Sequence, residues 1–188
     1  MKKIKIQNFL KPTINDIAKY IPGESSISGK KNIIKLSSNE SPFKIPKKIY
    51  SKVISMMEKI NFYPDGDSKE LKETIAKKFN IKKNQIICGN GSDDILSVIC
   101  QTFARENGEV ICNEFGFLYY PIIAKSAGAK VIIAKSKNLS ICCENILKKI
   151  TKKTNLIFIA NPNNPTGTII LKKELESFIK KIPKNIIL

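Results

Sequence analysis

The sequence predicts an α/β fold with a mostly parallel sheet that is covered by helices on both faces. From residue 85 onward, apolar runs of four or five residues alternate with stretches of helical spacing. The runs lack the polar alternation of a half-exposed strand, so we expect strands that are buried on both sides. The expected strands are 85–88, 109–112, 130–134, 156–160 and 185–188, and the expected helices lie near 92–105, 117–127, 143–150 and 172–181.

The region before residue 85 is expected to be an arm at residues 1–40 followed by helices. Asp67 with Glu70 three residues later resembles a capping box at a helix start. The expected elements here are a short helix at Thr13–Tyr20, a short strand at Ile33–Leu36, and helices over 46–60 and 67–79.

The composition is that of a globular protein. The 188 residues are 42% hydrophobic and 26% charged, which excludes disordered, collagen-like and coiled-coil classes. No apolar stretch reaches the ~18 residues of a transmembrane helix, and the basic start lacks the apolar segment of a signal peptide. Five cysteines without a Cys-x-x-Cys pair, and the absence of histidine, disfavour zinc binding. We therefore expect no metal site, reduced thiols and a cytoplasmic location.

The net charge of +17 leaves two interpretations open. A nucleic-acid-binding module needs many basic side chains to neutralise phosphates. Arg105 is the only arginine, however, and arginine is the usual residue for bidentate contacts with bases and phosphates. The lysines are spread along the chain, so we favour lysine-rich solvated faces and expect neither a nucleic-acid nor a membrane partner.

The stretch Gly89–Asp94 lies between an expected strand and an expected helix, where free amides favour an anion such as phosphate. A Walker loop requires Gly-Lys-Ser/Thr, which is absent. A dinucleotide fingerprint requires a third glycine where this chain has Asp94. A phosphorylated cofactor or substrate remains, and so does a plain glycine turn with Ser92 or Asp93 as the N-cap.

The stretch Asn161–Thr168 (Asn-Pro-Asn-Asn-Pro-Thr-Gly-Thr) directly follows an expected strand. Ligands of open α/β sheets bind outside the carboxyl ends of strands, so this loop and Gly89–Asp94 are expected at the same edge. Two prolines restrict the backbone and can aim an amide side chain at a ligand. A purely structural turn of Asn and Pro is the alternative.

Five segments together resemble the first half of a histidinol-phosphate aminotransferase. This family uses pyridoxal 5′-phosphate (PLP) and has the fold type I architecture of PLP enzymes. The resemblance implies a truncated three-layer large domain that binds PLP at residues 41–188, with residues 1–40 as an arm or part of a small domain. The segments are Leu36–Pro42, Tyr63–Asp67, Gly89–Asp93, Glu114–Pro121 and Asn161–Thr168.

The resemblance also implies roles for individual residues. Gly91, Ser92 and Asp93 are expected to hold the cofactor phosphate at a helix start. Phe117 is expected to lie flat on the pyridine ring, with core packing as the alternative. Asn164 is expected to donate its amide to the phenolic oxygen of PLP, from a loop in which Asn164–Pro165 is a cis peptide.

Further partners follow from the same resemblance. Tyr63 is expected to reach the PLP phosphate of a neighbouring subunit, which implies a homodimer, and Asn39 is expected to hold the substrate. The expected reaction moves an amino group between histidinol phosphate or an aromatic amino acid and 2-oxoglutarate. A dinucleotide-binding oxidoreductase and a basic nucleic-acid-binding module are the alternatives.

Residues that the chemistry requires follow residue 188 in the family. They are the lysine that forms the Schiff base and the Asp that pairs with the pyridine nitrogen, so we assign no catalytic residue in Met1–Leu188 and expect this polypeptide alone to be inactive. In the family, the run 85–88 pairs with strands that also come later. We therefore expect an unpaired strand and poor solubility for residues 1–188 alone.

Overall fold

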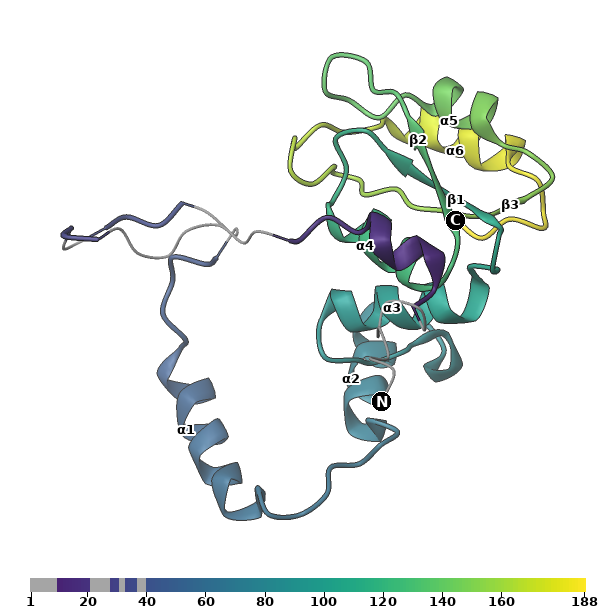
Figure 1. The fold of residues 1–188 in the computed structure, drawn as a ribbon. Helices are drawn as coiled ribbons and strands as arrows, with labels where there is room; N and C mark the ends of the chain where they lie inside the picture. Colours follow the sequence, from purple (N-terminus) through teal and green to yellow (C-terminus); the bar gives the residue numbers. More distant parts are fainter. Residues whose placement is uncertain (1–9, 21–27, 31–32, 37–39) are drawn as a thin grey trace, which may run out of the picture. The chain divides into compact units, whose positions relative to one another are not determined.

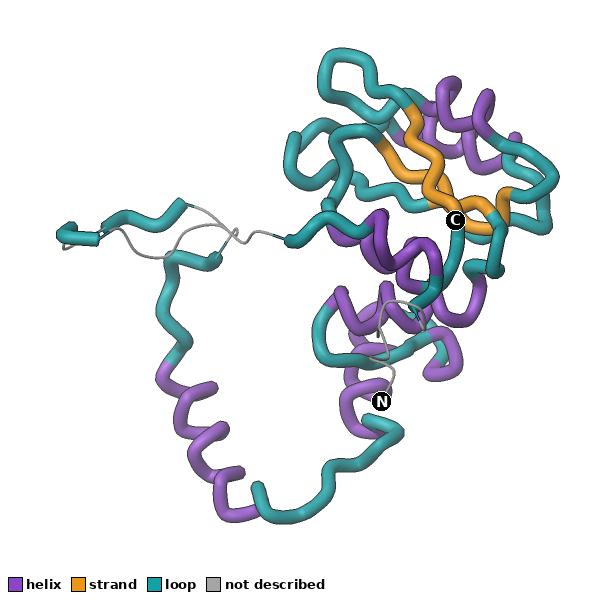
Figure 2. The backbone as a smooth tube through the Cα atoms, viewed as in Figure 1, coloured by secondary structure: helices purple, strands orange, loops and turns teal. Residues whose placement is uncertain are grey.

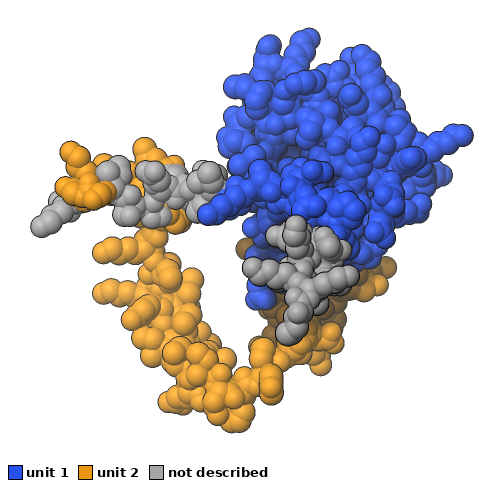
Figure 3. Space-filling model, in the orientation of Figure 1, with its two compact units in different colours: residues 1–20, 89–188 blue, residues 21–88 orange. Residues whose placement is uncertain are grey.

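The computed structural model describes residues 10–20, 28–30, 33–36 and 40–188 (Figure 1). The chain forms two compact units, one of residues 1–20 and 89–188 and one of residues 21–88 (Figure 3). The domain boundary expected after residue 40 falls inside the second unit and stays a prediction. The elements are η2 Pro12–Asp16, α1 Lys47–Met56, η3 Met57–Lys59, α2 Lys69–Phe79, η4 Lys83–Gln85, α3 Ser92–Phe103, β1 Glu109–Asn113, α4 Tyr119–Ser126, β2 Lys130–Ala134, α5 Cys143–Lys149, β3 Thr154–Ile157 and α6 Lys172–Lys181.

A parallel sheet with the order β2-β1-β3 forms the centre of the first unit (Figure 2). Glu109 of β1 lies opposite Lys130 on one side and Thr154 on the other. The next residue, Val110, pairs with Leu156, so the register shifts by one residue within β3. All five residues of β1 are buried, as expected for a central parallel strand.

Successive residues of β1 face opposite sides of the sheet and belong to two cores. Val110 and Cys112 pack with α3 and α4, whereas Ile111 packs with α5 and α6. Figure 1 shows α4 on one side of the sheet and α5 and α6 on the other, which confirms the three-layer α/β prediction. The first core is Cys100, Val110, Cys112, Ile123, Ala124, Ala129, Leu156 and Phe158, and the second is Ile111, Ala134, Ile141, Cys143, Ile146, Ile157, Ile170, Phe178 and Ile186.

Two of the expected strands are wrong. Residues 85–88 form no strand, because Gln85 ends η4 and its side-chain Oε1 accepts a hydrogen bond from Lys82 N (3.0 Å). Ile86 is extended, residues 86–88 have no ladder partner in the described part of the chain, and Ile87 is exposed. Residues 185–188 form a single bridge, in which Ile187 lies parallel to Leu156. An apolar run predicts burial, whereas a strand also needs a neighbour at the right register.

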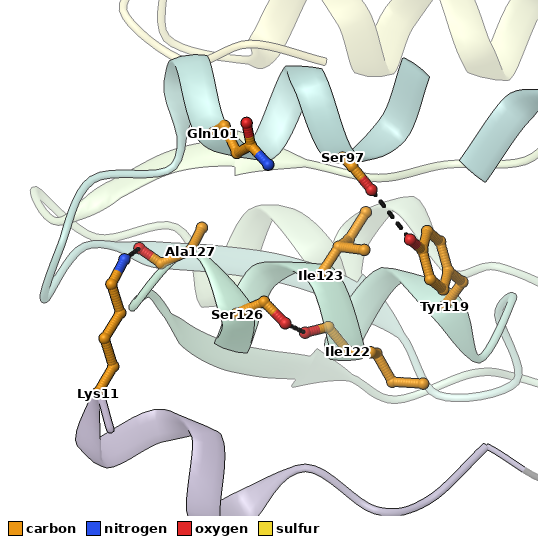
Figure 4. Close-up of a pocket in the computed structure, with 8 residues that line it drawn as sticks. All are labelled: Lys11, Ser97, Gln101, Tyr119, Ile122, Ile123, Ser126 and Ala127. Atoms are coloured by element: carbon orange, nitrogen blue, oxygen red, sulfur yellow. Dashed lines mark hydrogen bonds between the residues drawn. The ribbon is translucent and has the colours of Figure 1, made fainter. Parts of the chain in front are cut away.

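The N-terminal elements are shorter than the sequence predicts. Instead of a helix over Thr13–Tyr20, the chain forms the 3-10 turn η2, which lies against the end of α4. Thr13 Oγ1 donates a hydrogen bond to Lys125 O (2.6 Å), and Lys11 Nζ donates to Ala127 O (3.4 Å; Figure 4). Lys125 O also accepts a hydrogen bond from Gly128 N (2.9 Å), so the side chains of Lys11 and Thr13 add donors at the C-terminal end of α4. Ile33–Leu36 forms no strand.

The second unit contains α1, η3, α2 and η4, and the helix expected over 46–60 is divided between α1 and η3. The capping box of Asp67 and Glu70 is wrong, since the N-cap residue of α2 is Ser68 and its side chain makes no capping hydrogen bond. Asp65 caps the start of α2 instead. Its carboxylate accepts hydrogen bonds from Lys69 N (2.8 Å) and Asp67 N (3.0 Å). These bonds stabilise the charged form and lower the pKa of Asp65.

Burial keeps the core thiols protonated. Loss of solvation raises the pKa of Cys112 to about 12 and that of Cys100 to about 11. Thiolates are the reactive form of cysteine, so these two side chains act as small apolar residues.

No helix in the described residues is long and apolar enough to cross a membrane.

We predict that Phe178→Ala lowers the free energy of unfolding by about 3–5 kcal/mol, as loss of a large buried side chain does. The Phe178 side chain is only 2% exposed in the core beneath α5 and α6. Urea unfolding followed by circular dichroism measures the change. Ile179→Ala is the matched control on the same helix, since Ile179 is 49% exposed. Equal losses for the two variants would contradict this packing.

Candidate functional site

Two glycines shape the turn that leads into α3. Gly91 has φ +86° and ψ 176°, a region of backbone space that is essentially open to glycine alone. At Gly89 an added Cβ would lie 2.7 Å from Ile95 Cδ1 and 2.8 Å from Asp94 Oδ2. Any larger residue at either position strains or displaces the start of the helix.

The first turn of α3 has amide groups without an internal partner. Gly91 is the N-cap and no side chain caps the helix, so the alternative in which Ser92 or Asp93 acts as the N-cap is wrong. Asp94 Oδ2 accepts a hydrogen bond from Asn90 N (2.9 Å), upstream of the helix. Gly91, Ser92 and Asp93 are exposed, and no atom lies within 4 Å of a Cβ added at Gly91. Open space above free helical amides suits an anion such as phosphate.

The loop between β1 and α4 is fastened to the end of β2 by Glu114. Its carboxylate accepts hydrogen bonds from Lys135 Nζ (2.6 Å) and Ser136 N (3.1 Å). The hydrogen bond from Lys135 is the larger cause, and that from Ser136 the next, of a pKa for Glu114 below its usual value. The loop that carries Phe117 is therefore held by a charged contact at its first residue.

Phe117 lies outside both buried cores and is half-buried. Its ring meets Tyr120 edge-on at 5.6 Å between centroids, and Tyr120 in turn stacks on Phe158 at 4.6 Å with an angle of 4° between planes. Aromatic pairs prefer these two geometries. Phe117 thus contacts this pair from outside the buried cores, and its place on the pyridine ring stays a prediction.

The loop Asn161–Thr168 is closed by its own hydrogen bonds. Asn161 Nδ2 donates to Ile170 O (3.2 Å), and Ile170 N donates to Asn161 Oδ1 (2.9 Å). Asn164–Pro165 is a cis peptide, as predicted, and Asn161–Pro162 is cis as well. Asn164 itself is exposed at the turn.

Two hydrogen bonds connect these segments. Asn163 Nδ2 donates to Phe115 O (2.9 Å) and links the loop after β3 to the loop after β1. The hydroxyl groups of Ser97 and Tyr119 lie 2.9 Å apart and link α3 to α4 (Figure 4). Because β1 and β3 are parallel, their carboxyl ends open on one edge, and α3 begins there since it ends shortly before β1 starts. By this topology, five of the expected residues belong to segments at this edge: Gly91, Ser92, Asp93, Phe117 and Asn164.

The other two expected residues are not placed at this edge. Tyr63 belongs to the second unit, and its side chain is fully exposed. Asn39 lies outside the described residues. The sequence analysis missed Glu114 and Asn163, which hold the two loops. Both lie in recognised segments, but their types alone give no signal of which contacts they make.

The comparisons with known proteins agree with this geometry. Residues 31–188 match the family described as Aminotransferase class I and II. The chain belongs to this family. It is 45% identical over 172 residues to a histidinol-phosphate aminotransferase of Pelagibacter ubique and 42% identical over 159 residues to histidinol-phosphate aminotransferase 2 of Haemophilus influenzae strain 86-028NP. These matches cover 92% and 85% of this chain, but 48% and 43% of the relatives.

Solved structures share the fold of this chain. Histidinol-phosphate aminotransferase of Sinorhizobium meliloti, in complex with pyridoxal-5′-phosphate, matches with a TM-score of 0.75 at 19% identity and covers 79% of this chain and 41% of that one. A putative histidinol-phosphate aminotransferase of Erwinia carotovora matches with a TM-score of 0.70 at 25% identity, over 79% of this chain and 44% of that one. The chain spans about half the length of the curated relatives it matches.

No group of three or more side chains that could hold a metal ion occurs among the described residues. The first turn of α3 instead offers backbone amides at the positive end of a helix, with open space at Gly91. These donors fit a phosphate group, and the half-exposed ring of Phe117 fits a planar ring.

We predict that Glu114→Gln lowers the thermal unfolding midpoint near pH 7 by a few degrees at most, since exposed ion pairs contribute little. The pKa of Glu114 is lowered in the folded state, so its contribution is fully present above the ordinary value of 4.5. That contribution disappears as the pH falls through the lowered pKa, and the two proteins should then converge. Thermal scans across this range measure the difference. The control is Glu176→Gln, whose carboxylate lies 4.0 Å from Lys172. A difference that grows on acidification would contradict the assignment.

Proposed function

We propose that these residues form the cofactor-binding part of a PLP-dependent aminotransferase active site. The observation that carries the proposal is the open first turn of α3 at the same edge as the Phe117 and Asn164 loops. We further propose that the enzyme moves an amino group between histidinol phosphate, or an aromatic amino acid, and 2-oxoglutarate. The names of the curated relatives support this choice of substrate.

Each part of the site fits one part of PLP. The amides of Ser92 and Asp93, with the backbone freedom of Gly91, bind the phosphate at the positive end of α3. Phe117 offers a half-exposed aromatic face to the pyridine ring. Asn164 is exposed and donates its amide to the phenolic oxygen. When bound, PLP supplies an electron sink for the bonds of the amino donor.

The remaining proposals concern partners. Tyr63 is fully exposed and therefore free to reach the PLP phosphate of a second subunit in a homodimer. We retain Asn39 as a substrate contact. We also propose a cytoplasmic enzyme that binds no nucleic acid, because one arginine and dispersed lysines give no pattern for phosphate backbones.

We predict that Gly91→Ala weakens PLP binding by roughly tenfold, because the strain of its backbone region displaces the amides that bind phosphate. Titration of PLP followed by absorbance measures the dissociation constant. Gly128→Ala is the matched control, since Gly128 also has a positive φ (+91°) but lies between α4 and β2. A parent protein that binds NADH and not PLP would favour the oxidoreductase alternative.

We predict that the polypeptide of residues 1–188 alone does not transaminate. No motif in these residues corresponds to the lysine or the Asp that the family's chemistry requires. The assay follows turnover of histidinol phosphate with 2-oxoglutarate and added PLP, and borohydride reduction followed by mass spectrometry looks for a covalent lysine adduct. Robust turnover, or one stable adduct at a single lysine, would contradict the prediction.

A further inference from the structure

Asn163 is a buried residue between the two loops of the proposed cofactor site. It is only 4% exposed, whereas its neighbour Asn164 is exposed. Its Nδ2 donates one hydrogen bond to Phe115 O (2.9 Å) and one to Thr166 Oγ1 (2.7 Å). A side-chain amide has two such donors, so both are used.

The backbone of Asn163 is fixed as well. Asn163 N donates to Thr168 O (2.8 Å), and Gly167 N donates to Asn163 O (2.7 Å). These bonds surround the cis peptide Asn164–Pro165, so the residue that carries the proposed cofactor contact is enclosed by the hydrogen bonds of Asn163. The side chain of Asn163 therefore projects from a fixed point of this loop toward the loop after β1.

The Oδ1 atom of Asn163 is buried without a hydrogen-bond partner in the described part of the chain. An unsatisfied buried acceptor opposes folding, so an apolar residue of similar size would avoid that cost. An apolar residue would also leave Phe115 O without its donor. The position thus carries an amide in spite of this unfavourable acceptor, and what the amide contributes to the structure is its two donated hydrogen bonds.

We propose that Asn163 is a positioning residue that couples the Asn164 loop to the Phe117 loop, so that the two cofactor contacts keep one relative placement. The inference rests on the proposed function. Asn163 touches no reacting group; it acts through Phe115 O on the chain segment that leads to Phe117. Glu114 fastens the other side of that segment to the end of β2.

The competing explanation is that Asn163 only stabilises its own turn. Asn161 provides the comparison, since its amide also forms two hydrogen bonds but both stay with Ile170 at the base of the same loop. A local role makes the two asparagines equivalent in their effect on Phe117. A positioning role makes them different.

The experiment is a double-mutant cycle on the PLP-bound protein. Asn163→Ala and Asn161→Ala are each made alone and together with Phe117→Leu, and the PLP dissociation constant and the visible circular dichroism of bound PLP are measured. We expect Asn163→Ala to weaken PLP binding about tenfold when Phe117 is intact and by no more than about twofold when Phe117→Leu is also present. The reason is that the effects of substitutions at neighbouring residues of one network are not additive. The visible ellipticity per bound PLP should also fall. The factors for Asn161→Ala should multiply with those of Phe117→Leu.

A second variant covers the case in which Asn163→Ala does not fold. Asn163→Asp keeps the size of the side chain and its contact with Thr166, whose hydroxyl can donate to a carboxylate, but it cannot donate to Phe115 O. It should show the same coupling with Phe117→Leu. Multiplying factors for both Asn163 variants, with unchanged ellipticity, would overturn the inference while PLP binding by the parent still supported the proposed function. A parent that binds no PLP would instead overturn the proposed function and the inference with it.

Discussion

The central place of β1 in the parallel sheet is the constraint on which the rest of the first unit depends. Because β1 has hydrogen-bonded neighbours on both edges and helices on both faces, its five residues are buried and belong to two cores. The chain that leaves β1 then emerges between the ends of β2 and β3. Glu114 contacts the β2 side and Phe115 O the β3 side, so Phe117 is placed from both directions.

The same strand order explains why the site lies at this edge. The connection from β1 goes to β2 on one side, and the connection from β2 crosses to β3 on the other side. In open α/β sheets a crevice forms outside the carboxyl end of a strand where the connections change direction. Here that strand is β1. Three segments surround this point: the start of α3, the Phe117 loop and the Asn161–Thr168 loop. Their sequences have no motif in common, and what they share is a position next to a strand.

Local sequence patterns predicted those helices and strands whose ends are marked by the residues of the element itself. The bounds of β2 and α6 agree with the expected ranges to the residue, since apolar spacing and charged flanks mark both ends. The expected strand 85–88 is absent because a strand needs a second segment to pair with, and a local apolar pattern does not show whether that segment is present. The prediction of the residue that caps α2 was wrong for a different reason. Asp65 stands two residues ahead of the pair that fits the capping box, and only the turn geometry shows which carboxylate reaches the free amides.

Asn163 and Asn164 show where prediction from residue types ends. The motif identified this loop, and the cis peptide at Asn164–Pro165 was expected. Two adjacent asparagines have the same donors and acceptors, yet one is buried against Phe115 O and the other is exposed. That choice is made by the position of β1 relative to β3, which brings a carbonyl within reach of one amide only. The chemistry of a site can thus be predicted from its residue types, whereas the different roles of two identical neighbouring residues follow from the tertiary structure.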